Sequence, residues 1–202
     1  MRLLFAILAL ALTGALTVSC AGSRTDSAAS QPAVGGPVWT GGQTPRGQPP
    51  RGQAYRNMPG NALPVADFVL VDKSDRLLIA YRNGEAIRAY RSIRFGDAPQ
   101  GHKRFQGDER TPEGRYTIDW RNPQSRFHLS LRISYPNARD RAFAAQYGRS
   151  AGGDIFIHGQ PTGYRGPPIQ KDWTDGCIAL SNEEIEELWQ IVPDGTPIEI
   201  RP

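Results

Sequence analysis

The chain has few cysteines, no long apolar segment and no block of basic residues, and each shortage excludes a class of protein. Two cysteines among 202 residues are too few for a small domain held together by disulfides. The longest apolar run, Leu3–Leu16, is too short to span a bilayer comfortably, which excludes a protein with many membrane spans. The formal net charge of +4 comes from scattered arginines, so nothing indicates a nucleic-acid partner.

The first third of the chain predicts export rather than packed structure. Arg2, the apolar run and a small-residue stretch that ends in Cys20 are typical of a secretory signal, so residues 1–20 are predicted to be a signal peptide. Thr17–Cys20 resembles a bacterial lipobox, which predicts lipidation of Cys20, with ordinary signal cleavage beside it as the alternative. Residues 21–61 are rich in Gly, Pro, Gln, Ser and Thr and predict a disordered linker. The expected location is the periplasm or cell envelope, with membrane contact only through the lipid.

Residues 62–202 have the length of one ordinary domain, and their pattern predicts a mainly β fold with two short α-helices. The predicted strands cover residues 68–71, 76–81, 87–95, 116–120, 127–133, 154–158 and 196–200. One helix is expected over 138–147, and a second follows the capping-box pattern Ser181–Glu184. The Gly- and Pro-rich segments 96–114 and 159–173 are expected to be long loops.

Cys177 is the candidate nucleophile because an unpaired thiol in an exported protein requires an explanation. A cysteine attacks only as a thiolate, so it needs a base, and His158 ends an apolar strand beside Gly159. Gly176 directly before the cysteine leaves room for amide donors that stabilise an oxyanion. The residues alone leave open that Cys177 is a small buried side chain without chemistry. His102 and His128 are expected at the surface.

Two segments together carry a family resemblance. Ile157-His158-Gly159, followed after a loop by Asp172–Leu180, resembles the signature of YkuD-type L,D-transpeptidases. Arg110–Tyr116 and Gly195–Ile200 resemble the family's Thr-Pro-x-Gly-x-Tyr turn and its closing strand. The resemblance implies a single β-sandwich or barrel-like domain. It also implies a peptidoglycan-active enzyme whose cysteine attacks the carbonyl of a diamino acid next to D-alanine in a stem peptide.

The resemblance also implies roles for individual residues. Cys177 matches the nucleophile, His158 the base, and the backbone of Gly159 the group that orients the imidazole, while Gly176 shapes the oxyanion region. The expected substrate-binding residues are Trp173, Thr174 and Asn182. Asp175 and Ala179 depart from the family pattern, and we hypothesise that Asp175 supports the protonated imidazole, with a solvated turn residue as the alternative.

Several functions stay open. The acyl group can pass to an amine of another stem peptide or of an envelope protein, or to water, since the Asp-Trp-Thr-x-Gly-Cys-Ile-Ala form resembles a branch with hydrolytic members. A non-catalytic envelope lipoprotein that binds peptidoglycan is the rival from another class. A zinc hydrolase would draw ligands from His102, His128, His158 and Cys177. No two of these candidate ligands are close together in the sequence, as the ligands of a zinc site often are. We expect neither a metal nor a cofactor.

Overall fold

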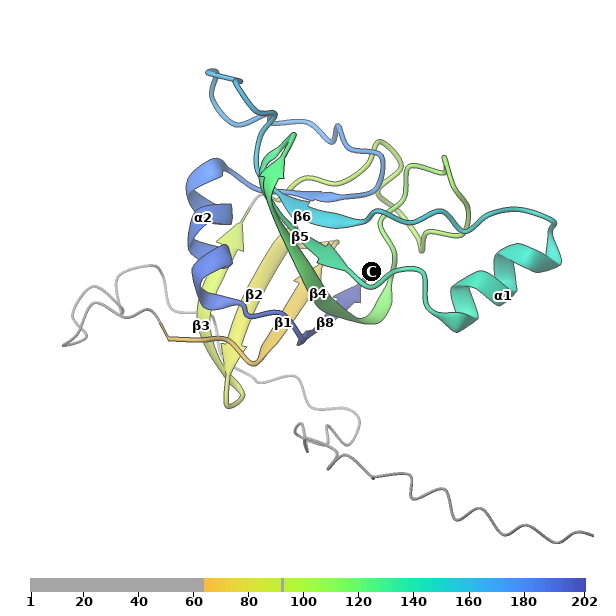
Figure 1. Cartoon of the computed structure of the whole chain (residues 1–202), viewed down its shortest axis with the longest axis horizontal. Coiled ribbons are helices and arrows are strands. Elements are labelled where there is room, and N and C mark those ends of the chain that lie inside the picture. The colour runs from red at the N-terminus through yellow and green to blue at the C-terminus, as the bar shows by residue number, and fades with distance from the viewer. Residues whose placement is uncertain (1–63, 92) are drawn as a thin grey trace, which may run out of the picture. The chain divides into compact units, whose positions relative to one another are not determined.

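The computed structural model describes residues 64–91 and 93–202, and the predicted signal peptide, Cys20 and the linker lie outside them. These residues form one curled eight-stranded sheet with strand order β3-β2-β1-β8-β4-β5-β6-β7 and two helices (Figure 1). The strands are β1 (Phe68–Asp72), β2 (Leu77–Arg82), β3 (Glu85–Arg91), β4 (Gly114–Ser125), β5 (His128–Ile133), β6 (Phe156–His158), β7 (Ile178–Ala179) and β8 (Thr196–Arg201). The helices are α1 (Ala138–Gln146) and α2 (Asn182–Ile191). The mainly β prediction with two short helices is confirmed.

The core forms on the inner face of the sheet because apolar side chains alternate along its strands. Val69 and Val71 of β1 and Ile198 and Ile200 of β8 are each at most 1 % exposed, and β1 pairs with β8 in parallel. The last strand of the chain therefore lies beside the first. Full burial of one such side chain contributes about 1.5–3 kcal/mol.

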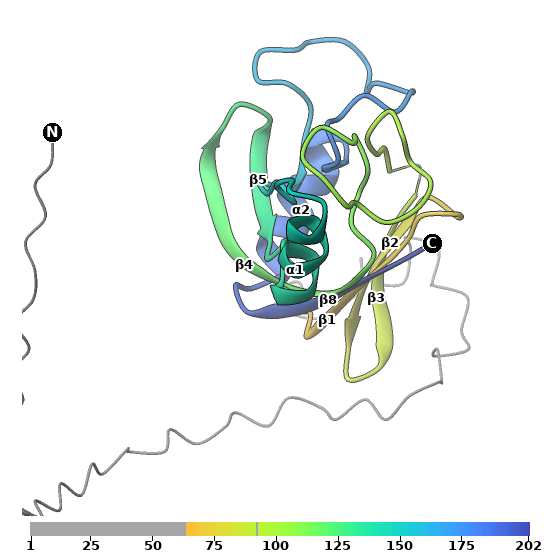
Figure 2. The same ribbon diagram turned by 90° about the vertical axis from the view of Figure 1, so that its right-hand side faces the viewer.

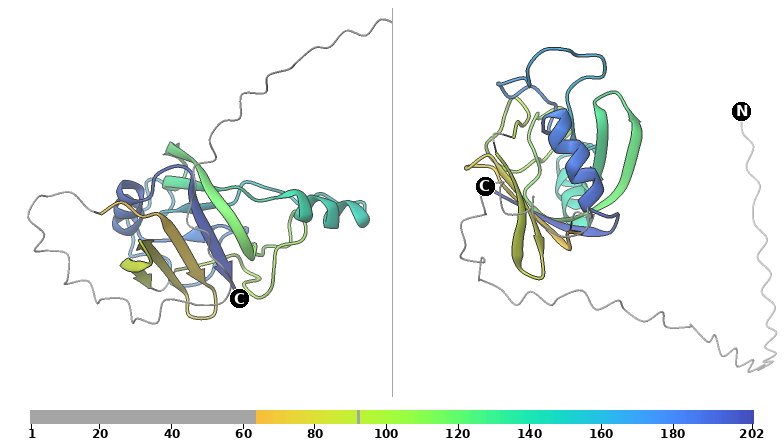
Figure 3. Two further views of the ribbon diagram at one scale, coloured as in Figure 1. Left: turned by 90° about the horizontal axis from the view of Figure 1, so that it is seen from below. Right: turned by 90° about the vertical axis from the view of Figure 1, so that its left-hand side faces the viewer.

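The two helices relate to the sheet differently. Helix α2 starts at the predicted capping box, where the Ser181 hydroxyl accepts from the Glu184 amide, and it buries Ile185, Leu188 and Ile191 against the core. Helix α1 buries only Asp140 and Ala144. It extends away from the body of the domain, as two views at right angles show (Figures 1 and 3). The helix that packs on the sheet is the one with the amphipathic pattern.

The sheet differs from the sequence prediction mainly around β4 and β6. Strand β4 extends to Ser125 and forms a long bent hairpin with β5 (Figure 2), whereas the sequence predicts a strand over 116–120. Shifts of register along the hairpin interrupt the ladder and explain why the alternating pattern stops early. Strand β6 is shorter than predicted because regular pairing begins only at Phe156.

Parallel pairing of β6 with β7 places the candidate residues. Ile157 pairs with Ile178 and His158 with Ala179. Because side chains two residues apart along a strand share a face, His158 and Cys177, which directly precedes β7, project from the same face of this pair. Strand β7, directly after Cys177, is fixed from its other side, since Arg94 and Ala179 exchange two backbone hydrogen bonds of 3.0 and 2.8 Å.

Candidate active site

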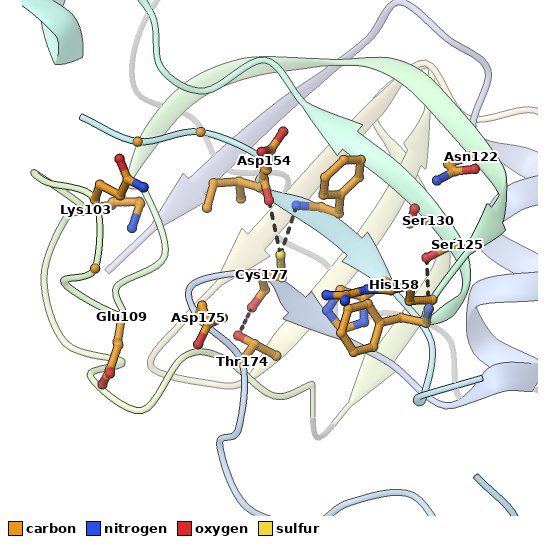
Figure 4. Close-up of a pocket in the computed structure, with 18 of the residues that line it drawn as sticks. Lys103, Glu109, Asn122, Ser125, Ser130, Asp154, His158, Thr174, Asp175 and Cys177 are labelled. Atoms are coloured by element: carbon orange, nitrogen blue, oxygen red, sulfur yellow. Dashed lines mark hydrogen bonds between the residues drawn. The ribbon is translucent and has the colours of Figure 1, made fainter. Parts of the chain in front are cut away.

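The sulfur of Cys177 lies in the wall of a cavity with two backbone partners. The amide of Phe156 donates to Sγ at 3.4 Å, and the thiol points to the carbonyl oxygen of Asp154 at 3.5 Å. No hydrogen bond joins Sγ to His158 among the described residues, although both side chains line the same cavity (Figure 4).

The imidazole of His158 is held in the tautomer that a base requires. Its Nδ1 lies 2.7 Å from the carbonyl oxygen of Gly159, and because a carbonyl only accepts, Nδ1 carries the proton. The lone pair therefore resides on Nε2, for which no partner exists among the described residues. The predicted orienting role of the Gly159 backbone agrees with this contact.

Aromatic rings enclose the imidazole. Phe127 stacks on it with 4.5 Å between ring centroids, and Trp173 meets it edge-on at 5.5 Å. The side chain of His158 is fully buried, and the indole Nε1 of Trp173 is buried without an acceptor in the described part of the chain. Trp173 lines the cavity, as expected of a substrate contact. Phe127 was not predicted, since its position one residue before β5 carries no sequence signal.

Burial keeps both reacting groups uncharged at neutral pH. Desolvation lowers the pKa of His158 to about 4. Burial raises the pKa of the Cys177 thiol to about 11, with opposing contributions from the Phe156 amide and Lys103, which lower it, and from the carboxylates of Asp175 and Asp154, which raise it. The resting pair is therefore thiol and neutral imidazole, and charge separates only when the groups meet.

The cavity has a volume of about 870 Å³, large enough for a peptide segment. Its wall opposite His158 carries Lys103, Glu109, Asp154 and Asp175 around Cys177 (Figure 4). Lys103 is buried and pairs with Asp108 at 2.8 Å. The hairpin of β4 and β5 supplies the polar wall on the other side, through Asn122, Gln124, Ser125 and Ser130.

A family model described as the L,D-transpeptidase catalytic domain, YkuD, matches residues 66–200. The chain belongs to the YkuD family. It is 30% identical over 132 residues to the Escherichia coli K12 protein named "Putative L,D-transpeptidase YafK", and the match covers 62% of this chain and 46% of YafK. The resemblance inferred from the motifs is thereby confirmed.

Solved structures give the same assignment for the fold. Pgp2 of Campylobacter jejuni, described as a helical cell shape determining protein, superposes with a TM-score of 0.52 at 27% identity, covering 70% of this chain and 51% of Pgp2. A point mutant of Pgp2 gives 0.54 at 29% identity, covering 68% and 47%. The chain spans about half the length of these relatives.

At two glycines of the YkuD domain, neighbouring atoms lie so close to the backbone that a side chain would collide with them. A Cβ on Gly176, whose φ is +123°, would lie 2.5 Å from the carbonyl oxygen of Arg110, at the start of the Thr-Pro-x-Gly-x-Tyr turn. A Cβ on Gly159 would lie 2.6 Å from Oδ1 of Asn182. The motifs that are separate in the sequence are therefore packed against one another at the site.

The turn that delivers Cys177 is fixed by side chains before it. The hydroxyl of Thr174 donates to the Cys177 carbonyl at 2.8 Å and accepts from the Gly176 amide at 3.2 Å. Asp172 makes two 2.7 Å contacts with the Arg76 guanidinium and accepts from the Phe95 amide at 2.9 Å. The Gly176 amide therefore already has an acceptor, and the expectation that Gly176 shapes the oxyanion region stays a prediction.

Two predicted site residues occupy other positions than expected. Asn182 does not line the cavity, because its Oδ1 accepts from the Gln160 amide at 2.9 Å and fixes the chain after His158. The structure gives it a positioning contact in place of the expected substrate contact. Asp175 is exposed at the cavity and makes no hydrogen bond or ion pair with His158 in the described part of the chain. Its negative charge instead raises the pKa of the Cys177 thiol, after the larger effect of burial.

The remaining histidines of the YkuD domain belong to two separate networks. His102 accepts the Glu113 amide at 2.8 Å and donates to Asp140 at 3.2 Å, with its side chain 14 % exposed. The expectation that His102 is a surface residue is therefore wrong, because a polar loop sequence hides its burial. His128 pairs with Glu186 at 2.7 Å. Within residues 64–91 and 93–202, no cluster of three or more His, Cys, Asp or Glu residues could hold a metal ion.

Proposed function

We propose that this protein is a peptidoglycan-modifying L,D-transpeptidase that acylates Cys177 with a stem peptide at the bond before D-alanine. The observation that carries the proposal is that a free thiol and an imidazole with an unprotonated Nε2 line the same cavity, which is large enough for a peptide. Family membership supports the reaction type. Stem peptides are the proposed substrate.

The reaction we assign has two stages. Nε2 of His158 takes the thiol proton as the Cys177 sulfur turns toward it, and the thiolate attacks the stem carbonyl. The backbone amide of Cys177 is the donor that we assign to the oxyanion, since Thr174 holds the carbonyl of the same residue in place. His158 then returns the proton to the leaving amine, which leaves an acyl-enzyme.

The second stage decides the product. An amine of another stem or of an envelope protein gives a crosslink or an anchored protein, whereas water gives a carboxypeptidase or amidase. We favour transfer, and the test is incubation of the purified full chain with tetrapeptide muropeptides followed by mass spectrometry. Crosslinked dimers are expected. Shortened stems alone would assign hydrolysis instead, and untouched substrate would favour the binding-only lipoprotein.

Matched variants separate catalysis from binding. Cys177→Ala should abolish every product while muropeptide binding remains, because one thiol contributes little to packing. Cys20→Ala, which changes the other cysteine, should leave the products of the purified protein unchanged. If Cys177→Ala kept the wild-type rate, acyl transfer through this cysteine would be wrong.

We also propose that the protein is exported and anchored by lipid at Cys20, with the following segment as a tether between membrane and peptidoglycan. The support is the lipobox-like Thr17–Cys20 and the composition of residues 21–61. Metabolic labelling with a fatty-acid probe should tag the protein. A signal that persists in Cys20→Ala would contradict the anchor.

A further inference from the structure

An aromatic and cationic patch lies where α1 and the residues just after it meet the loop between β3 and β4. It is formed by Arg104, Phe105, Phe143, Tyr147 and Arg149. The three rings contact one another with centroids 5.1–5.9 Å apart. The Arg104 guanidinium lies 4.4 Å over Phe143 and that of Arg149 lies 3.9 Å over Phe105. Tyr147 is 60 % exposed, and both arginines are exposed. An exposed aromatic cluster of this kind marks an interaction surface.

The patch is not simply the underside of a packed helix. Helix α1 makes no substantial contact with any strand of the described sheet, and it buries only Asp140 and Ala144. Of the three rings, only Phe105 packs against the core. Helix α1 stands away from the body of the domain (Figure 3), and the core does not account for the rings of Phe143 and Tyr147.

The patch is continuous with the catalytic cavity. Gln106 and Gly107, which directly follow Phe105, line that cavity, and so do Ser150 and Gly152, which follow Arg149. The two segments are joined, since the Gln106 amide donates to the Ser150 carbonyl at 2.9 Å. A Cβ on Gly152 would lie 3.1 Å from Cα of Gln106, so the segments are in close contact. A substrate that leaves the cavity on this side meets the patch.

The chemistry of the patch suits an uncharged, hydroxyl-rich polymer. Stacked guanidinium groups keep their N–H edges free to donate, and the Tyr147 ring offers apolar surface. The acidic groups beside it are already bonded: Asp108 to Lys103, and Asp140 to Tyr116 at 3.0 Å. Exposed α1 side chains are alanine, arginine and glutamine.

We propose that this patch binds the sugar strand of peptidoglycan that carries the stem peptide in the cavity. The inference rests on the proposed function, because a stem peptide bound at Cys177 has its carrier strand outside the cavity mouth. Sugar hydroxyl and acetamide oxygens accept from Arg104 and Arg149, and a sugar ring covers Tyr147. The patch then adds affinity for polymeric substrate without touching the reacting bond.

The kinetic test compares two substrates with the full chain. Tyr147→Ala and Arg149→Gln should each lower kcat/KM about threefold to tenfold for stems on glycan strands, through KM rather than kcat. Both variants should change the rate for a soluble sugar-free stem peptide by less than about twofold. Tyr164→Ala is the matched control, because Tyr164 is 42 % exposed on the loop after β6 and does not line the cavity. It should change neither rate. Equal losses on both substrates, or no loss on strands, would overturn the proposal.

A binding test with a variant that cannot react measures the contribution of the patch alone. Cys177→Ala protein should bind glycan strands stripped of stem peptides, and adding Tyr147→Ala should weaken this binding about threefold to tenfold. Thermal unfolding of each variant checks that the fold is retained. Binding to anionic lipid vesicles but not to strands would overturn the proposal in favour of a membrane surface, and strand binding that Tyr147→Ala leaves unchanged would also overturn it. If strands bind as expected but no stem is processed by the unsubstituted chain, the patch is supported and the proposed function fails.

Discussion

His158, which is buried, and His102, which is half-buried, are two histidines of one domain with opposite surroundings. His158 lies among aromatic rings with a single hydrogen bond, from Nδ1 to a backbone carbonyl. His102 has both ring nitrogens bonded, one to a backbone amide and one to Asp140, and Asp140 in turn accepts from Tyr116 and Asn137. Burial is the largest cause that lowers the pKa of each. A lowered pKa therefore does not tell a catalytic histidine from a structural one.

The difference between them is an unused nitrogen that faces a cavity. Nε2 of His158 has no partner in the described part of the chain, and a nucleophile lies on the same face of the β6–β7 pair. The network around His102 continues through Glu113 to the buried Lys73, which contacts it at 2.7 Å. Such a saturated network stabilises structure and offers no group for proton transfer.

The largest expected effect comes from removing the base. His158→Gln should lower kcat about 100-fold to 10,000-fold, because a positioned general base contributes that much. His102→Gln should change kcat less than about threefold, since both of its nitrogens are engaged away from Cys177. Steady-state rates on one muropeptide measure both variants. Comparable losses in the two would remove the distinction between the histidines.

The pH dependence of stability sharpens the comparison. The pKa of His158 is lowered to about 4 from 6.5, so between these values the unfolded chain binds a proton that the folded chain does not. The free energy of unfolding therefore falls as pH decreases from about 6.5 to 4, by about 3 kcal/mol from this group. Urea unfolding of wild type and His158→Gln over this range measures it. The variant should show a shallower decline, and parallel curves would contradict the burial of a neutral imidazole.

His102→Gln should instead lower the free energy of unfolding, by about 1–3 kcal/mol at pH 7. The substitution leaves buried partners of the network, among them Asp140, with poorer hydrogen bonds. Urea unfolding measures the loss, and His128→Gln is a suitable control because the His128–Glu186 pair is half exposed. If the two variants were equally stable, the His102 network would contribute no more than a surface pair.

The sequence allowed the proposed reacting pair to be identified but not its surroundings. His158, Gly159, Gly176 and Cys177 lie in short motifs at strand ends, where type and spacing carry the signal. Phe127 and the Arg76–Asp172 pair could not be predicted, since they depend on contacts between segments far apart in the chain. Asn182 was expected in the substrate site for a related reason: its type suits substrate binding as well as the contact with Gln160 that it makes. Thr174 lines the cavity and also holds the turn before Cys177.

The smallest effect concerns Asp175, where the sequence and the structure suggest opposite outcomes. If Asp175 supported the protonated imidazole, Asp175→Asn would slow turnover. The structure indicates that its charge opposes the thiolate, because it adds to the effect of burial in raising the pKa of Cys177. Removing the carboxylate should then increase alkylation of Cys177 by iodoacetamide at pH 8 about twofold to fivefold, since the thiolate is the reactive form.

Mass spectrometry of the Cys177 peptide follows the reaction. The control is Asp75→Asn, which changes an exposed turn residue outside the cavity. Slower alkylation in Asp175→Asn, together with slower turnover, would return Asp175 to the supporting role.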